Sequence, residues 1–80
     1  MSNEYFLKPE TRSWYIVADA PELRRLTLYL KERKIKYYVE AWSLINDVEF
    51  HIIFDAPSDQ IEKIKMDIHR DVFIFFGTEE

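Results

Sequence analysis

The side chains that most often carry out catalysis or bind metals are few in this chain and are scattered along it. It has no cysteine, two histidines and one glycine. His51 and His69 have no spacing to each other or to carboxylates that indicates a metal site. The serines, at positions 2, 13, 43 and 58, match no nucleophile motif, and a single glycine leaves no glycine-rich loop for phosphate. We therefore expect no enzyme activity, no cofactor and no metal.

Basic side chains gather in one segment, although the chain as a whole has a net charge of −4. The acidic total disfavours nucleic-acid binding through a broadly basic surface. Several of these cations fall at the end of a predicted helix, where they complement the helix dipole. This basic patch consists of Arg24, Arg25, Lys31, Arg33, Lys34 and Lys36.

The composition indicates a single folded domain. Apolar residues make up 48% of the chain and aromatic residues 16%, which is too much apolar character for a disordered segment. The absence of cysteine excludes disulfides. No signal-peptide pattern begins the sequence, and no apolar run approaches the ~20 residues of a membrane span. A cytoplasmic protein is expected.

Two similar stretches organise the sequence. The run from Trp14 to Ala18 ends in Asp-Ala-Pro, and so does the run from Phe50 to Phe54. A segment with helical spacing follows each run, and a further aromatic, strand-like run follows each helix. Two copies of strand–helix–strand predict the order βαββαβ, which resembles the split βαβ arrangement of ferredoxin-like domains. The expected fold is α+β: a four-stranded antiparallel sheet in the order 4-1-3-2 with two helices on one face.

The boundaries follow from the same patterns. The predicted strands cover 13–18, 35–42, 48–54 and 72–76, and the first helix runs to about residue 33. Asp19 and Glu22 have the spacing of a capping box at the start of that helix, and Asp55 or Ser58 is expected to cap the second helix. The domain divides into an N-terminal arm, a folded core and an acidic tail, over residues 1–12, 13–76 and 77–80.

Alternation along the strands places large apolar side chains on both faces of the sheet. Val48, Phe50, Ile52 and Phe54 are expected to face the helices. If Val72 also faces them, the opposite face carries two aromatic residues from the last strand. We call this opposite side the open face, and its predicted partner-binding residues are Tyr15, Val17, Tyr38, Trp42, His51, Ile53, Phe73 and Phe75.

An apolar open face predicts a protein-interaction module without catalytic activity, because contiguous exposed apolar surface usually marks an interface. The partner is another protein or a second copy of the chain, and a homodimer is the simplest choice. In an alternative, Phe6 and Leu7 of the arm cover the face. The composition is similar to that of small bacteriophage accessory proteins that act on host machinery.

Two further families share the element order. RNA-recognition-motif domains place a stacking ring where Tyr15 stands, and this resemblance implies single-stranded RNA binding through Tyr15 and His51. Their third strand has a basic–glycine–aromatic frame, whereas Glu49, His51 and Ile53 occupy it here. ACT-type domains also resemble this chain in element order, which implies small-molecule sensing. Their first strand is usually followed by a glycine-rich turn, whereas Asp19 begins an Asp-Ala-Pro turn here.

Overall fold

The computed structural model describes residues 11–76. It is an α+β domain in which the elements follow the order βαββαβ, with one short 3-10 turn, η1, before the second helix. The elements are β1 (Thr11–Ala18), α2 (Ala20–Glu32), β2 (Tyr37–Ser43), β3 (Val48–Pro57), η1 (Ser58–Gln60), α3 (Ile61–Ile68) and β4 (Phe73–Ile74). Residues 1–10 and 77–80, which include most of the predicted arm and the acidic tail, lie outside the described residues.

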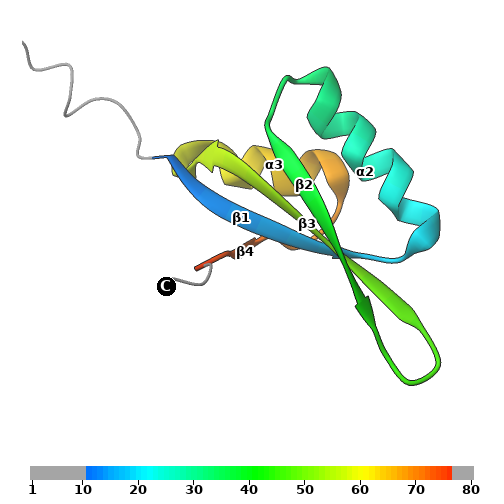
Figure 1. Ribbon diagram of the computed structural model, residues 1–80. Helices are drawn as coiled ribbons and strands as arrows, with labels where there is room; N and C mark the ends of the chain where they lie inside the picture. Colours follow the sequence, from blue (N-terminus) through cyan, green and yellow to red (C-terminus); the bar gives the residue numbers. More distant parts are fainter. Residues whose placement is uncertain (1–10, 77–80) are drawn as a thin grey trace, which may run out of the picture.

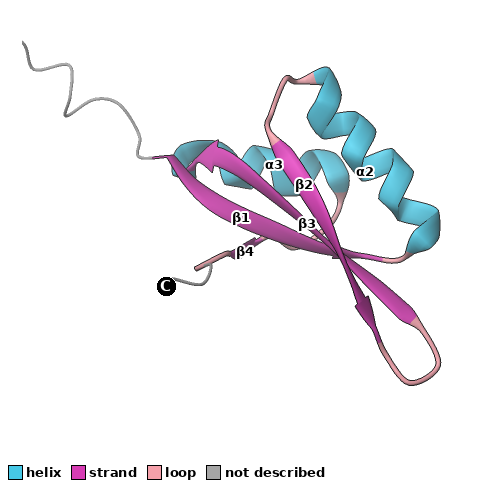
Figure 2. Cartoon of the chain, viewed as in Figure 1, coloured by secondary structure: helices cyan, strands magenta, loops and turns pink. Residues whose placement is uncertain are grey.

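The strands form one four-stranded sheet in the order β2-β3-β1-β4, and all neighbours are antiparallel. Read from the β4 edge, this is 4-1-3-2, the arrangement expected from the sequence. Both helices lie on one side of the sheet, and the β2–β3 hairpin projects beyond them (Figures 1 and 2). The central pair, β1 with β3, is in register from Thr11↔Pro57 to Ala18↔Phe50.

Helix α2 begins as its sequence predicts. The carboxylate of Asp19 accepts a hydrogen bond from the Glu22 N–H at 3.1 Å, and it thereby satisfies one of the free donors of the first turn. Pro21 stands in the first turn, where its missing N–H costs nothing. Leu26 and Leu30 are completely buried, so the apolar side of this helix faces the sheet.

The same helix ends in a turn that the sequence did not reveal. The Ile35 N–H donates to the Leu30 carbonyl and the Lys34 N–H to the Lys31 carbonyl, each at 3.0 Å. This is the hydrogen-bond pattern of a Schellman motif, which needs a left-handed residue and usually has glycine there. Lys34 takes that position with φ 59°. Ile35 packs against the core beside the end of the helix.

The two Asp-Ala-Pro stretches have different structures. Asp19 caps a helix, but Asp55 remains in β3, where its carboxylate accepts a hydrogen bond from the Ser13 hydroxyl at 2.7 Å. The expected capping of the second helix by Asp55 or Ser58 is therefore wrong. Pro57 and Gln60 precede η1 and α3, and neither makes a side-chain cap bond. The strand continues because β1 extends to Thr11 and pairs with β3 as far as Pro57.

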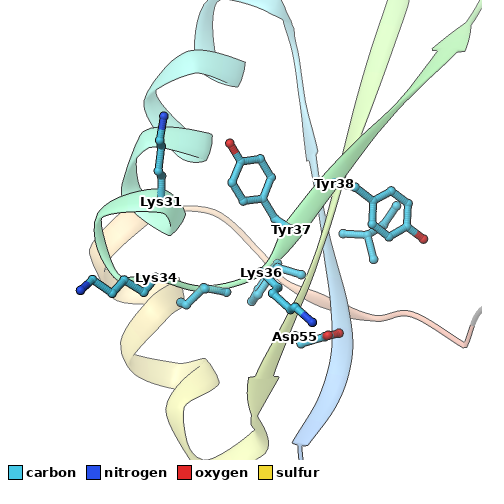
Figure 3. A pocket seen from close by; sticks show the side chains of 9 residues that line it. Lys31, Lys34, Lys36, Tyr37, Tyr38 and Asp55 are labelled. Atoms are coloured by element: carbon cyan, nitrogen blue, oxygen red, sulfur yellow. The ribbon is translucent and has the colours of Figure 1, made fainter.

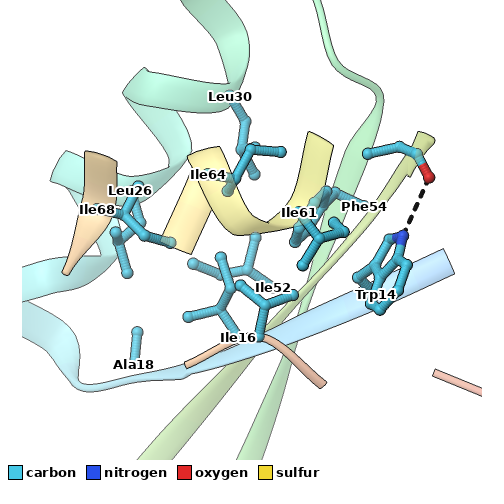
Figure 4. Close-up of a cluster of buried hydrophobic side chains, with 12 residues drawn as sticks. Trp14, Ile16, Ala18, Leu26, Leu30, Ile52, Phe54, Ile61, Ile64 and Ile68 are labelled. Carbon is cyan, nitrogen blue, oxygen red and sulfur yellow. Dashed lines mark hydrogen bonds between the residues drawn. The ribbon is translucent and has the colours of Figure 1, made fainter. Parts of the chain in front are cut away.

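The hydrophobic core lies between the helices and the β1–β3 pair (Figure 4). Each fully buried aliphatic side chain contributes about 1.5–3 kcal/mol to the stability of the fold. The Trp14 Nε1–H donates to the Ala56 carbonyl at 3.0 Å, so its buried polar group has a partner. The core residues are Trp14, Ile16, Ala18, Leu26, Leu30, Ile52, Phe54, Ala56, Ile61, Ile64, Ile68 and Val72.

Several predicted strand boundaries need correction. β1 begins at Thr11 rather than Ser13, and β2 covers 37–43 rather than 35–42, because the turn after α2 occupies the residues before it. β4 is reduced to Phe73–Ile74. On β3, Val48 is exposed and Phe50 is only partly buried, although both were expected to face the helices. They lie toward the β2–β3 hairpin, which projects past the helices (Figure 1).

The core assignment predicts a large difference between two leucines of α2. Leu30→Ala should lower the free energy of unfolding by about 2–5 kcal/mol, because it leaves a cavity in the core. Leu28→Ala removes the same atoms from a side chain that is 50% exposed, and it should change stability by less than about 0.5 kcal/mol. Urea denaturation measures both. Equal losses of stability for the two variants would mean that α2 is rotated about its axis from the orientation described, with Leu28 as buried as Leu30.

Because Lys34 has a left-handed conformation, glycine substitutions at Lys34 and Lys31 should have opposite effects on stability. Lys34→Gly should raise the free energy of unfolding by up to about 1 kcal/mol, because glycine adopts positive φ without steric cost. Lys31→Gly removes the same charge from within α2, and it should lower stability by about 1 kcal/mol. Thermal denaturation of both variants checks the sign. Destabilisation by Lys34→Gly would contradict the assigned turn.

Candidate functional site

The open face carries one row of large side chains across all four strands. Strand pairing sets Phe73 of β4 opposite Tyr15 of β1, Tyr15 opposite Ile53 of β3, and Ile53 opposite Tyr38 of β2. Side chains that are directly opposite on antiparallel strands point to the same face. The predicted partner-binding residues are thus brought together by the sheet. Val17 extends the group because it pairs with His51.

Tyr15 is at the centre of a set of ring contacts on this face. Its ring centroid lies 5.5 Å from that of His51, 5.4 Å from Phe73 and 6.4 Å from Phe75. His51 in turn stacks on Trp42 at 4.9 Å. These separations are those of favourable aromatic pairs, ~4.5–7 Å. The rings form one continuous row from β4 to β2, and both aromatic residues at the β4 end lie on the open face.

The accessible part of this surface lies at its two sides. Tyr38 and Trp42, on β2, are about half exposed, at 51% and 50%, and Phe73 is 45% exposed. Ile53 is only 3% exposed but does not belong to the core on the helix side; it lies between Tyr15 and Tyr38 on the neighbouring strands. The prediction that Ile53 contacts a partner needs correction: its side chain lies beneath the surface and exposes little area to a partner.

The open face carries more negative than positive groups. By strand alternation, Glu40, Glu49 and Asp55 point to this side with Lys36 as the lysine among them. Glu49 Oε1 lies 3.5 Å from Nε2 of His51. The apolar rings are therefore bordered by carboxylates, and a complementary surface would present Lys or Arg at its border.

The hairpin that joins β2 to β3 adds exposed apolar side chains that sequence reasoning missed. Ile45 is 97% exposed at its tip, and Leu44 and Val48 beside it are also exposed. The sequence shows a turn here because Asn46 and Asp47 are turn residues. Leu44 and Ile45, the two apolar residues just before them, could have indicated that the turn carries exposed apolar side chains.

The basic patch predicted from the sequence does not form one surface. Arg25 donates to the Ile68 carbonyl at 3.2 Å, which connects α2 to the end of α3. The Arg33 guanidinium lies over the Tyr29 ring, 3.9 Å from its centroid, a cation–π contact. Arg24 is exposed on α2. At least two of the six cations therefore have structural roles.

The three lysines of the patch line a hollow of about 540 Å³ where α2 leads into β2 (Figure 3). Lys31, Lys34 and Lys36 surround it together with Tyr37 and Asp55. Figure 3 shows the three ammonium groups pointing in different directions. They do not converge on a single anion, so the hollow has positive charge around it without the geometry of a phosphate site.

A polar contact joins the outer sides of the two helices. The Tyr29 hydroxyl donates to Asp67 Oδ2 at 2.7 Å, and the Lys63 ammonium donates to the same oxygen at 3.2 Å. Burial, followed by the hydrogen bond to Asp67, raises the pKa of Tyr29 to about 12. The hydrogen bonds from Tyr29 and Lys63 lower the pKa of Asp67. The contact stabilises the packing of the helices and lies away from the open face.

A metal site and a membrane-spanning helix each have a recognisable residue pattern. Within residues 11–76, no three His, Asp or Glu side chains are grouped so that they could hold a metal ion. Neither helix in that range has the length and apolar character of a bilayer span. His69 ends α3 in a left-handed conformation, with φ 57°, so its place is set by the backbone turn.

No protein-family model, curated protein or solved structure matches this chain. The candidate site is therefore defined by its own geometry. It consists of the ring row on the open face, with its carboxylate border and the exposed apolar hairpin at one end.

The Tyr29–Asp67 contact predicts a pH-dependent stability. A carboxylate whose pKa is lowered by folding stabilises the fold above its unfolded pKa, about 4, and that contribution is lost as the pH falls through the folded value. Asp67→Asn should therefore destabilise the chain at pH 7 and make little difference at pH 2. Urea denaturation across this range measures it. In a Tyr29→Phe background the effect should shrink, and an unchanged effect there would contradict the hydrogen bond as the main cause.

Proposed function

We propose that this chain is a protein-interaction module of the ferredoxin-like type, which binds another protein through its open face and catalyses no reaction. The observation that carries the proposal is the row of rings on the side of the sheet that neither α2 nor α3 covers. The uncovered side of an antiparallel sheet is normally polar. A contiguous apolar surface in that position is typical of an interface.

The side chains on this face are of the kinds that dominate binding energy. Tyr38 and Trp42 are half exposed at the β2 side, and Trp and Tyr are the residue types most enriched at interface hot spots. Ring contacts among Tyr15, His51 and Trp42 hold the surface in place before any partner arrives. A surface ordered in advance loses less conformational entropy on binding.

The occupant we propose is a protein that presents an apolar centre bordered by Lys or Arg. The argument is charge complementarity with Glu40, Glu49 and Asp55, which outnumber Lys36 on this face. Two copies packed face to face would bring these carboxylates toward one another. The same carboxylates would repel a phosphate backbone, which favours protein over RNA as the ligand.

Two substitutions on the open face should weaken this binding. Tyr15→Glu puts a charge at the centre of the ring row, and Trp42→Ala removes an exposed anchor; each should reduce affinity at least about tenfold. Leu28→Ala, on the outer side of α2, is the matched control and should bind as the unmodified chain does. Affinity purification provides the partner, and titration calorimetry with the purified partner measures Kd. We expect a negative heat-capacity change and weaker binding at higher salt.

The outcomes separate the candidate occupants, provided that far-UV circular dichroism shows each variant folded. Unchanged affinity of the purified partner for both open-face variants would overturn the proposal. If Tyr15→Glu abolished self-association in light scattering, without any partner, a second copy would be the occupant of the open face instead. Binding of a single-stranded RNA oligonucleotide that Tyr15→Glu abolishes would identify nucleic acid as the ligand.

A further inference from the structure

β2 is an edge strand without the usual protection against pairing. It runs from Tyr37 to Ser43, and among residues 11–76 only β3 pairs with it, on one side. Natural edge strands are commonly protected by proline, bulges or several charges. β2 has no proline, Glu40 is its only charged residue, and its register with β3 is unbroken. Such a strand can pair with a further strand through its main chain.

The direction of its free main-chain groups follows from one hydrogen bond. The Asp55 N–H donates to the Lys36 carbonyl at 3.2 Å, so the groups of Lys36 point toward β3. In an antiparallel ladder without bulges this alternates from residue to residue. Tyr37, Val39 and Ala41 therefore direct their N–H and C=O groups away from β3, toward the free edge.

Both faces of this strand are also uncovered. On the helix side, Tyr37 and Val39 are exposed, and the described buried core includes no residue of β2. On the other side, Tyr38 and Trp42 are half exposed. A strand added at the edge would cover part of both faces at once through cross-strand side-chain pairs, which a protein bound to the open face alone would not do.

We propose that β2 pairs with β2 of a second copy, antiparallel, about a two-fold axis at Val39. The two four-stranded sheets then continue into one another with the helices of both copies on the same side. Val39 faces the second copy's Val39, and Tyr37 faces the second copy's Ala41. These residues direct their main-chain groups to the free edge, so each such pair exchanges two hydrogen bonds.

The charges on and beside β2 are compatible with a second copy in this register and exclude the register centred on Glu40. With the axis at Val39, Tyr38 lies opposite the second copy's Glu40, and Lys36 lies opposite its Trp42. The lysine then meets an aromatic ring, a favourable contact, and no like charges face one another. With the axis at Glu40, two carboxylates would be directly opposite, which is destabilising.

This pairing goes beyond the proposed function and does not depend on it. It would set two open faces side by side on one continuous sheet. A partner with two matching sites would then be held by both faces, and the second contact would form at high effective concentration.

Single cysteine variants test the register directly, because the chain has no cysteine of its own. In the proposed pair the two Val39 Cα atoms are about 5.5 Å apart, within the ~4.4–6.8 Å range for a disulfide. Mild oxidation of Val39→Cys should give a covalent dimer on a non-reducing gel. Ile45→Cys is the control, because it is 97% exposed and would lie about 40 Å from its counterpart at ~3.4 Å per residue. Equal cross-linking of both variants, or none for Val39→Cys, would contradict the pairing.

A second pair of variants tests the main-chain contact. Val39→Pro removes a donor that points to the free edge, a position where proline is tolerated, and it should turn the dimer into a monomer in light scattering. Val39→Thr keeps the N–H and the branched shape, and should remain dimeric. A dimeric Val39→Pro would overturn the proposal; if that variant does not fold, the cysteine pair decides.

The two proposals fail separately. Tyr15 is on β1 and has no part in the edge contact. Combined with Val39→Cys, Tyr15→Glu should therefore leave the cross-link unchanged while it weakens binding of the partner at the open face. Loss of the cross-link in this double variant would show that the open face, and not the β2 edge, joins the copies.

Discussion

The structure depends on the antiparallel pairing of β1 with β3. This pair is the middle of the sheet, and both helices pack on it through one buried cluster. Because successive side chains of a strand point to opposite faces, Trp14 and Ile16 can enter the core only if Tyr15 and Val17 go to the other side. The run from Trp14 to Ala18, which is apolar at every position, therefore produces an apolar open face as a direct consequence of its core. The same pairing keeps Asp55 in a strand and prevents it from capping a helix.

The helices determine which apolar positions are actually buried. They cover β1 and β3, and they leave β2 and the β2–β3 hairpin uncovered (Figure 1). Val39 and Val48 are on the helix side of the sheet by strand alternation, but they are exposed because the helices do not reach them. The uncovered surface is thus continuous from the open face, around the β2 edge, to the hairpin tip. Both proposed interactions use this one region, the first through side chains and the second through the main chain.

The charged groups are arranged around this region in two ways. Arg25 donates to the Ile68 carbonyl at the end of α3, and Arg33 lies 3.9 Å from Asp67 of α3, so both charges serve the packing of the helices. Glu40 lies on the strand that is free to pair, and Lys36 directly precedes that strand. An isolated basic cluster in the sequence therefore gives little information about function, since its members separate onto different sides of the helix and the following turn.

The sequence by itself determined the element order, the sheet order, the buried stripe of each helix and the membership of the open face. These depend on local periodicity and on the few ways in which βαββαβ can close. Only the tertiary structure decided that Ile53 is covered, that the basic patch divides and that β2 is exposed on both faces. It also decided that one Asp-Ala-Pro begins a helix while the other continues a strand. The physical reason is the same in each case: these properties depend on which distant segment lies against a residue, and a local pattern does not contain that information.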